Sequence, residues 1–127
     1  MRLLLDTNAF LFAINPTERL GKIVSELLHN PEVERWVSSV SFWEIATKVQ
    51  IGKLPLPSDP AFYARHIQNL DARRLPLEMR HSMELFHLPL HHRDPFDRML
   101  IAQARVEGLT LASNERVFAA YDVPRIW

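Results

Sequence analysis

The feature that most constrains this chain is its alternation between short apolar runs and longer segments with helical spacing. Residues 3–5 are three consecutive leucines, which is typical of a strand buried on both faces of a parallel sheet. Residues 20–28 instead carry apolar side chains three and four positions apart, as on one face of a helix. Strands that alternate with helices in this way pack as a sheet covered by helices. We therefore predict an α/β fold in a single domain over residues 1–127, with a central parallel β-sheet flanked by α-helices.

The order of the predicted elements follows from the turn and capping residues between the periodic segments. Strands are expected at residues 3–5, 35–39, 74–77, 109–112 and 125–127, and helices at 9–14, 20–28, 41–50, 61–70, 78–86, 95–107 and 113–120. Asn15, Pro16 and Thr17 should break the first helix, and Gly108 should end the helix that begins at Pro95.

The composition excludes several classes of site. The chain has no cysteine, which rules out disulfides, zinc–thiolate sites and thiol catalysis. Its 15 basic and 15 acidic residues balance, so a nucleic-acid partner would have to be held by a local basic patch. Asp6 cuts the apolar run at the N-terminus, which leaves the run too short for a signal-peptide core or a membrane span. We expect a cytoplasmic protein that does not associate with a membrane.

Polar side chains follow predicted strands or open predicted helices at four places. They are Asp6, Glu44, Asp94 with Asp97, and Ser113 with Asn114. Ligands of open parallel sheets bind at the carboxyl ends of the strands, so these side chains should share one rim. Helix capping also explains each of them singly. Asp6 and Asp94 fit N-caps, and Ser41 with Glu44 fits a capping box. Asp97 would lie in the first turn of its helix, where a negative charge interacts favourably with the helix dipole.

Capping does not explain why several carboxylates should gather at one rim, where they repel and some of their pKa values rise. A bound divalent cation removes this repulsion, and oxygen ligands suit Mg²⁺ or Mn²⁺. Such a cation polarises a phosphoryl oxygen and activates water near neutral pH, and two cations about 4 Å apart clamp both the attacking and the leaving oxygen. The acids are therefore consistent with phosphodiester cleavage that needs no protein nucleophile.

The segments around these acids resemble the PIN domain family, and within it the VapC-like toxins of toxin–antitoxin pairs. Residues 4–8, Leu-Leu-Asp-Thr-Asn, resemble the opening motif of the family. Residues 92–104, His-Arg-Asp-Pro-Phe-Asp-Arg-Met-Leu-Ile-Ala-Gln-Ala, resemble a more specific signature of the VapC-like subfamily. Residues 41–44 match the position of the second acid, and 111–115 resemble the segment of the last polar position. The resemblance covers essentially the whole chain.

The resemblance implies a metal-dependent endoribonuclease that hydrolyses RNA phosphodiester bonds. The residues that it implies are Asp6, Glu44 and Asp97 as Mg²⁺ or Mn²⁺ ligands, Asp94 as an auxiliary catalytic acid, and Thr7, Asn8, Ser113 and Asn114 as supporting polar residues. Asn114 departs from the family, since many members have Asp at this position. A second metal would then be weak, or would bind only with RNA. Glu115 is adjacent, but its side chain is expected to point elsewhere.

Basic residues near the acids are candidates for binding RNA. Arg93, Arg98 and Arg116 can each donate two hydrogen bonds to a phosphate. Lys48 lies one helical turn after Glu44 and is expected to be ordinary surface charge. The rings of His91 and His92 are expected to pack in a loop rather than to carry protons or bind phosphate.

The toxin resemblance implies three partners: an RNA substrate, a cognate antitoxin protein and a second copy of the chain in a homodimer. The first helix fits a protein contact, because Phe10, Leu11, Phe12 and Ile14 make it apolar almost all round. Such a helix is buried on several sides or covered by a partner.

Other function classes remain open at this stage. A phospho-acceptor domain would need an acidic pair after the first strand and a late lysine, and Asp6 has no acidic neighbour. A phosphatase with an Asp-x-Asp motif is disfavoured, because Asn8 replaces the second Asp. A non-catalytic PIN-like RNA- or protein-binding module and a housekeeping PIN ribonuclease are the main alternatives. RNA binding without cleavage would favour the first, and the absence of a small neighbouring reading frame would favour the second.

Overall fold

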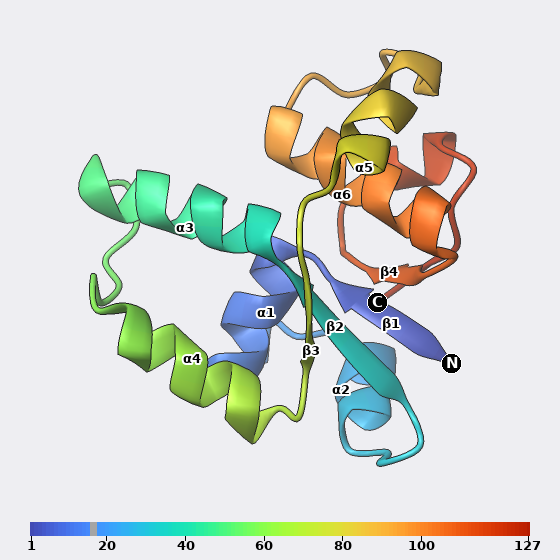
Figure 1. Cartoon of the computed structure of the whole chain (residues 1–127). Helices are drawn as coiled ribbons and strands as arrows, with labels where there is room; N and C mark the ends of the chain where they lie inside the picture. The colour runs from blue at the N-terminus through green and yellow to red at the C-terminus, as the bar shows by residue number, and fades with distance from the viewer. Residues whose placement is uncertain (16–17) are drawn as a thin grey trace.

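A parallel β-sheet runs through the centre of the chain in this computed structural model, which describes residues 1–15 and 18–127 (Figure 1). Its strands are β1 (Arg2–Leu5), β2 (Glu34–Ser38), β3 (Arg73–Leu75), β4 (Thr110–Ala112) and β5 (Arg125–Ile126). They lie in the order β3-β2-β1-β4-β5, and every neighbouring pair is parallel. The predicted α/β class with a central parallel sheet is confirmed.

Helices cover both faces of this sheet. They are α1 (Thr7–Ile14), α2 (Lys22–Leu28), α3 (Ser39–Gln50), α4 (Pro60–Asn69), α5 (Met79–Glu84) and α6 (Pro95–Glu107), with short 3₁₀ turns η1 (Leu85–His87) and η2 (Arg116–Ala120). Figure 1 shows α1 and α2 on one side of the sheet and α5 and α6 on the other. Among the described residues, no helix combines the length and the apolar character needed to cross a bilayer.

The three leucines of β1 divide the core between these two layers. Leu4 packs with residues of α6 and β4, whereas Leu3 and Leu5 pack with residues of α1, α2 and α4. All three side chains are fully buried. Successive side chains of a strand point to opposite faces, so an uninterrupted apolar run is what a strand between two helical layers requires. β1 is therefore the structural centre of the fold.

The topology also marks where a ligand would bind. The chain goes from β1 to β2 on one side, and β4 later pairs with β1 on the other side. This reversal of strand order opens a crevice at the carboxyl ends of β1 and β4. Asp6 directly follows β1 and Ser113 directly follows β4, so both lie at this switch point.

Several boundaries differ from the predictions because of local hydrogen bonds. The third helix starts at Ser39, because the Ser38 hydroxyl caps it by accepting from the Val40 backbone N–H at 3.0 Å. The predicted capping box of Ser41 and Glu44 is therefore wrong. The first helix starts at Thr7 rather than at residue 9, and the second at Lys22 rather than at residue 20.

Two predicted helices are also shorter or tighter than expected. Segment 78–86 divides into α5 and η1, and segment 113–120 forms only the 3₁₀ turn η2. Asn15 ends α1 as expected, whereas the predicted break at Pro16 and Thr17 lies outside the described residues.

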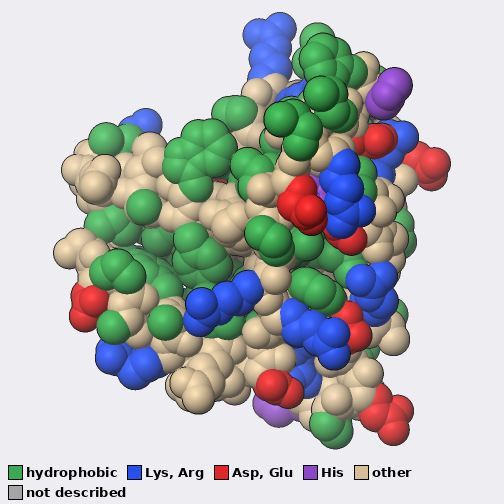
Figure 2. Space-filling view, viewed as in Figure 1, with side chains coloured by type: hydrophobic (Ala, Val, Ile, Leu, Met, Phe, Trp, Pro, Cys, Tyr) green, Lys and Arg blue, Asp and Glu red, His purple; other side chains and the backbone are tan. Residues whose placement is uncertain are grey.

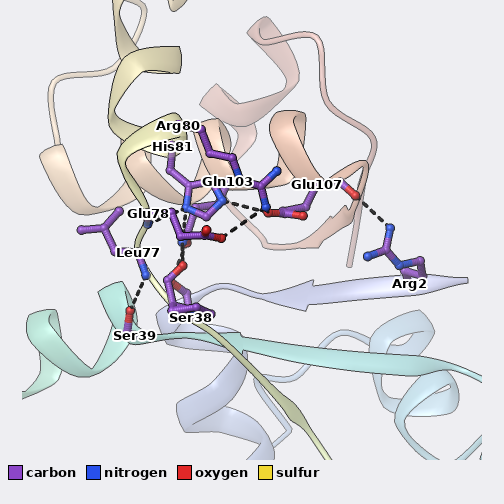
Figure 3. A network of polar contacts seen from close by, with 10 residues as sticks. Arg2, Ser38, Ser39, Leu77, Glu78, Arg80, His81, Gln103 and Glu107 are labelled. Atoms are coloured by element: carbon purple, nitrogen blue, oxygen red, sulfur yellow. Dashed lines mark hydrogen bonds and ion pairs between the residues drawn. The ribbon is translucent and has the colours of Figure 1, made fainter.

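A buried polar network ties α5 and α6 to the start of α3 (Figure 3). The Ser38 hydroxyl donates to Gln103 Oε1 at 2.5 Å, and Gln103 Nε2 donates to the Pro76 carbonyl and to His81 Nδ1, each at 3.3 Å. Ser38, His81 and Gln103 are all fully buried. Buried polar groups are costly unless they are paired, and Gln103 pairs with the Ser38 hydroxyl, the Pro76 carbonyl and His81 at once.

Replacing Gln103 with leucine should lower the free energy of unfolding by about 1–3 kcal/mol, because the Ser38 hydroxyl loses its acceptor inside the core. Urea denaturation measures this change. The matched control is Gln68→Leu at an exposed position of α4, where the change should stay within about 0.5 kcal/mol. Equal effects of the two substitutions would contradict the role given to the network.

Candidate active site

A small polar pocket lies at the switch point of the sheet, with a volume of about 150 Å³. Its lining residues are Asp6, Thr7, Asn8, Glu44, Lys48, Asp94, Asp97 and Glu115. The residues come from the start of α1, from α3, from the start of α6 and from the segment after β4. All four acids that the sequence analysis singled out, which come from three separate parts of the chain, therefore meet in one place.

Asp6 is held by the start of the helix that it caps. One carboxylate oxygen accepts from the Ala9 backbone N–H at 2.7 Å, and the residue is only 2% exposed. Burial raises its pKa to about 6, and the nearby charges of Asp97 and Glu115 add to this rise. A hydrogen bond from the Ser113 hydroxyl works in the opposite direction. Asp6 is thus a carboxylate that is oriented but poorly solvated.

Asp94 and Asp97 occupy the first turn of α6. Asp94 is the N-cap and accepts from the Asp97 backbone N–H at 2.9 Å, with Pro95 at the first helical position, as predicted. The Asp97 carboxylate lies 2.7 Å from Nε2 of His92. The pKa of Asp97 is raised to about 6, mainly by burial and also by the charges of Asp94 and Glu44, while the hydrogen bond with His92 acts to lower it.

Glu44 projects from α3 and is almost completely buried. Its Oε1 accepts from the Thr7 hydroxyl at 2.6 Å, and its Oε2 lies 2.5 Å from Nζ of Lys48. The Thr7 hydroxyl also lies 3.1 Å from the Ser41 hydroxyl. The hydrogen bond to Glu44 raises the pKa of Lys48, which keeps its ammonium charged. The expectation that Lys48 is ordinary surface charge is wrong, because its head group lines the pocket.

The segment after β4 also differs from expectation. Ser113 is fully buried, and its hydroxyl accepts from the Glu115 backbone N–H at 3.1 Å. This bend turns Glu115 into the pocket, whereas Asn114 is exposed and does not line it. The expectation that Glu115 points elsewhere is wrong, because the chain has left the sheet after Ala112 and no longer alternates between its faces.

The three arginines that were expected to bind RNA divide into two kinds. Arg98 donates to the carbonyl oxygens of Pro89, His92 and Leu88, so its guanidinium holds the loop before α6. Arg93 and Arg116 are exposed and do not line the pocket, and their contact with RNA stays a prediction.

The two neighbouring histidines behave differently from each other. The ring of His91 packs on Tyr121, as expected of a loop residue. The ring of His92 instead contacts the Asp97 carboxylate, so its expected role as packing alone is wrong.

A second cluster of possible metal ligands lies elsewhere, at Glu78, His81 and Glu107 (Figure 3). The ligand atoms of these three residues lie within 4.8 Å of one another. His81 Nδ1 accepts from the Glu78 backbone N–H at 3.0 Å, which leaves its Nε2 to donate to Glu107 at 3.0 Å. Arg80 pairs with both glutamates. Since a metal would have to displace these contacts, the cluster is better explained as a structural capping network.

The polar pocket, by contrast, suits a hard divalent cation. Its buried acids offer carboxylate oxygens, which Mg²⁺ and Mn²⁺ prefer, and the chain has no thiolate to favour softer metals. Of the described residues that line the pocket, Lys48 alone carries a positive charge. Burial is the main cause of the raised pKa values of Asp6 and Asp97, and neighbouring acids add to it, so a bound cation would favour the charged forms of both. The donor set therefore fits such an ion.

A larger groove of about 780 Å³ lies between α3 and α4, away from the acids. Phe42, Ile45 and Val49 of α3 and Tyr63 and Ile67 of α4 line it. Figure 2 shows apolar side chains around this hollow on the left of the molecule. No carboxylate is among the lining residues of this groove, which distinguishes it from the acidic pocket.

Comparison with known proteins agrees on one fold. The PIN domain family model matches residues 3–124. A crystal structure described as VapBC2 from Rickettsia felis bound to a promoter DNA fragment superposes with a TM-score of 0.71 at 15% identity, covering 100% of this chain and 99% of that chain. DNA-bound VapBC from Salmonella typhimurium has a TM-score of 0.71 at 18% identity, with 99% and 97% covered.

A third structure, FitAcB from Neisseria gonorrhoeae, has a TM-score of 0.67 at 18% identity, with 98% of this chain and 96% of that chain covered. At these identities the superpositions show a shared fold. No curated protein sequence matches the chain.

Asp6→Asn should stabilise the metal-free protein at pH 8. The pKa of Asp6 is higher in the folded state than its ordinary value of 3.8, so its favourable contribution is complete below about pH 4 and is lost as the pH rises through about 6. Asparagine keeps the cap without the buried charge. The gain should be about 1–3 kcal/mol at pH 8 with EDTA, and it should shrink toward zero at pH 4.

Chemical denaturation at both pH values measures this difference. Asp71→Asn is the matched control, since Asp71 is exposed with φ 51°, a conformation that asparagine tolerates. A stabilisation by Asp6→Asn that persists unchanged at pH 4 would show that the cause is not the charge of Asp6.

Proposed function

This chain belongs to the PIN domain family, and from that premise we propose that its acidic pocket is the active site of a metal-dependent endoribonuclease. The observation that carries the proposal is the meeting of Asp6, Glu44 and Asp97 in one buried pocket. Each comes from a different segment, so local capping alone does not account for their convergence. Phosphodiester hydrolysis at clustered carboxylates with a divalent cation needs this donor set.

Asp6 and Asp97, with Glu44 beside them, would hold Mg²⁺ or Mn²⁺. When bound, such an ion polarises the scissile phosphate and makes water a better nucleophile. The protein's own contribution is to fix the carboxylates. Ser113 donates to Asp6, and Thr7 donates to Glu44 at 2.6 Å. Side chains held in this way lose little freedom when substrate binds.

Asp94 and His92 position Asp97 rather than touching the reacting atoms. Asp94 fixes the first turn of α6 through the Asp97 backbone N–H. His92 contacts Oδ2 of Asp97 at 2.7 Å and so fixes the orientation of the carboxylate through one of its two oxygens. We place the RNA backbone over the mouth of the pocket near Asn8, with the exposed Arg93 and Arg116 as candidate phosphate contacts.

Purified wild-type chain should cleave labelled structured RNA with Mg²⁺ or Mn²⁺ and not with EDTA. Asp6→Asn and Asp97→Asn should each lower the cleavage rate more than about 100-fold, because even residues that only orient metal ligands are worth about 10–100-fold. Gel analysis of the RNA measures the rate. Asp71→Asn, outside the pocket, should cleave like wild type.

Two outcomes would turn the proposal toward its alternatives. If the folded protein, free of any partner, binds RNA without cutting it, the result would favour a non-catalytic RNA-binding module. Cleavage that survives both substitutions would place the active site elsewhere in the chain.

The biological role that we propose is that of a toxin held by an antitoxin. The similar solved structures from Rickettsia felis and Salmonella typhimurium are described as VapBC, and another, from Klebsiella pneumoniae, as a toxin–antitoxin complex. The apolar groove between α3 and α4 is a suitable place for an apolar helix of such an antitoxin. A homodimer and a cytoplasmic location belong to the same proposal. A housekeeping ribonuclease is the alternative.

Ala64→Arg should weaken the complex with the product of a small reading frame adjacent to the gene. Ala64 lines the groove, and an arginine there places charge against an apolar helix. A loss of at least about 10-fold in affinity is expected by titration calorimetry, with RNA cleavage unchanged. Ala119→Arg, at an exposed position outside the groove, is the control. Equal affinity in both variants would remove the groove from the interface.

A further inference from the structure

The pocket contains a cation of its own, and this bears on how many metal ions it can bind. Lys48 lies one turn after Glu44 on α3, so the two side chains share one helix face. Its Nζ is 2.5 Å from Glu44 Oε2, and the side chain is 41% exposed while that of Glu44 is 7% exposed. The ammonium therefore contacts a buried acid, although part of the Lys48 side chain remains in water. The inference below rests on the proposed function of this pocket.

Glu44 has no oxygen without a hydrogen-bond donor. Oε1 accepts from the Thr7 hydroxyl at 2.6 Å, and Oε2 accepts from Lys48. A divalent cation approaching Oε2 would meet the ammonium at contact distance and be repelled. Asp97 differs from Glu44, because within the described part of the chain its carboxylate is contacted by one side chain, the ring of His92, and at one oxygen. A metal is accordingly accommodated more easily between Asp6 and Asp97 than beside Glu44.

The position of the one basic residue in the pocket supports the same division. Of the described residues that line the pocket, Lys48 is the only lysine or arginine, and it contacts Glu44, so the charges of Asp6 and Asp97 are left for a divalent ion. Asp94 and Glu115 also line the pocket, so it is the contact of Lys48 with Glu44, and not the total charge, that excludes an ion there.

We propose that this pocket binds a single divalent cation, on the side of Asp6 and Asp97, and that the ammonium of Lys48 takes the place of a second cation beside Glu44. Lys48 is then a positioning residue that holds Glu44 and excludes a second ion. The neighbouring acids Asp94 and Asp97 also act on Lys48, since their charges help to raise its pKa.

The test counts bound Mn²⁺ and does not depend on activity. Equilibrium dialysis at pH 7.5, with free Mn²⁺ measured by electron paramagnetic resonance, is applied to the wild-type chain and four variants. Lys48→Gln and Lys48→Met remove the charge, Lys48→Arg keeps it, and Lys53→Gln removes an exposed lysine outside the pocket. Circular dichroism confirms that each variant is folded.

Wild type, Lys48→Arg and Lys53→Gln should each bind one Mn²⁺ per chain, and Lys48→Gln and Lys48→Met should bind two. Two ions in the wild type, together with metal-dependent RNA cleavage, would overturn the inference and leave the proposed function standing. One ion in both uncharged Lys48 variants would also overturn it, and would leave Lys48 to contact the RNA phosphate instead. No Mn²⁺ bound by the folded wild type would overturn the proposed function together with the inference.

Discussion

The burial of carboxylates at the carboxyl end of a parallel sheet is the constraint on which the rest of this structure depends. Asp6 and Glu44 are almost inaccessible to water, and burial raises the pKa values of Asp6 and Asp97 to about 6. Such a group is unfavourable unless donors and cations compensate it. The compensation comes from separate parts of the chain: the first turn of α1, the hydroxyls of Thr7 and Ser113, and the ammonium of Lys48.

The sheet makes this arrangement rigid enough to hold the acids together. β1 is paired on both sides and packed on both faces, so Asp6 follows the most constrained strand of the fold. α3 and α6 bring Glu44 and Asp97 to the same crevice from opposite sides of the point where strand order reverses. Stability lost by burying the acids is offset by the apolar core around β1, which is where the leucines lie.

The contrast between two polar clusters shows why composition alone does not identify a site. Glu78, His81 and Glu107 lie close together, yet the ring nitrogens of His81 are both hydrogen-bonded and Arg80 neutralises the glutamates. In the pocket, burial and neighbouring acids raise the pKa values of Asp6 and Asp97, so a bound cation would favour the charged forms of these two carboxylates. A cluster whose hydrogen bonds and charges are already satisfied supports the fold, whereas buried acids with raised pKa values mark a candidate functional site.

The sequence by itself determined the α/β class, the position of Asp6 after a buried strand and the caps of α6, because periodicity and capping act over a few residues. Tertiary structure alone decided which other side chains enter the pocket. Lys48 was expected to be ordinary surface charge and Glu115 to point elsewhere, yet both line the pocket. His92 was expected to pack in a loop, yet its ring contacts Asp97. Their places depend on how α3, the bend after β4 and the loop before α6 meet in space. No short-range pattern encodes those long-range packing angles.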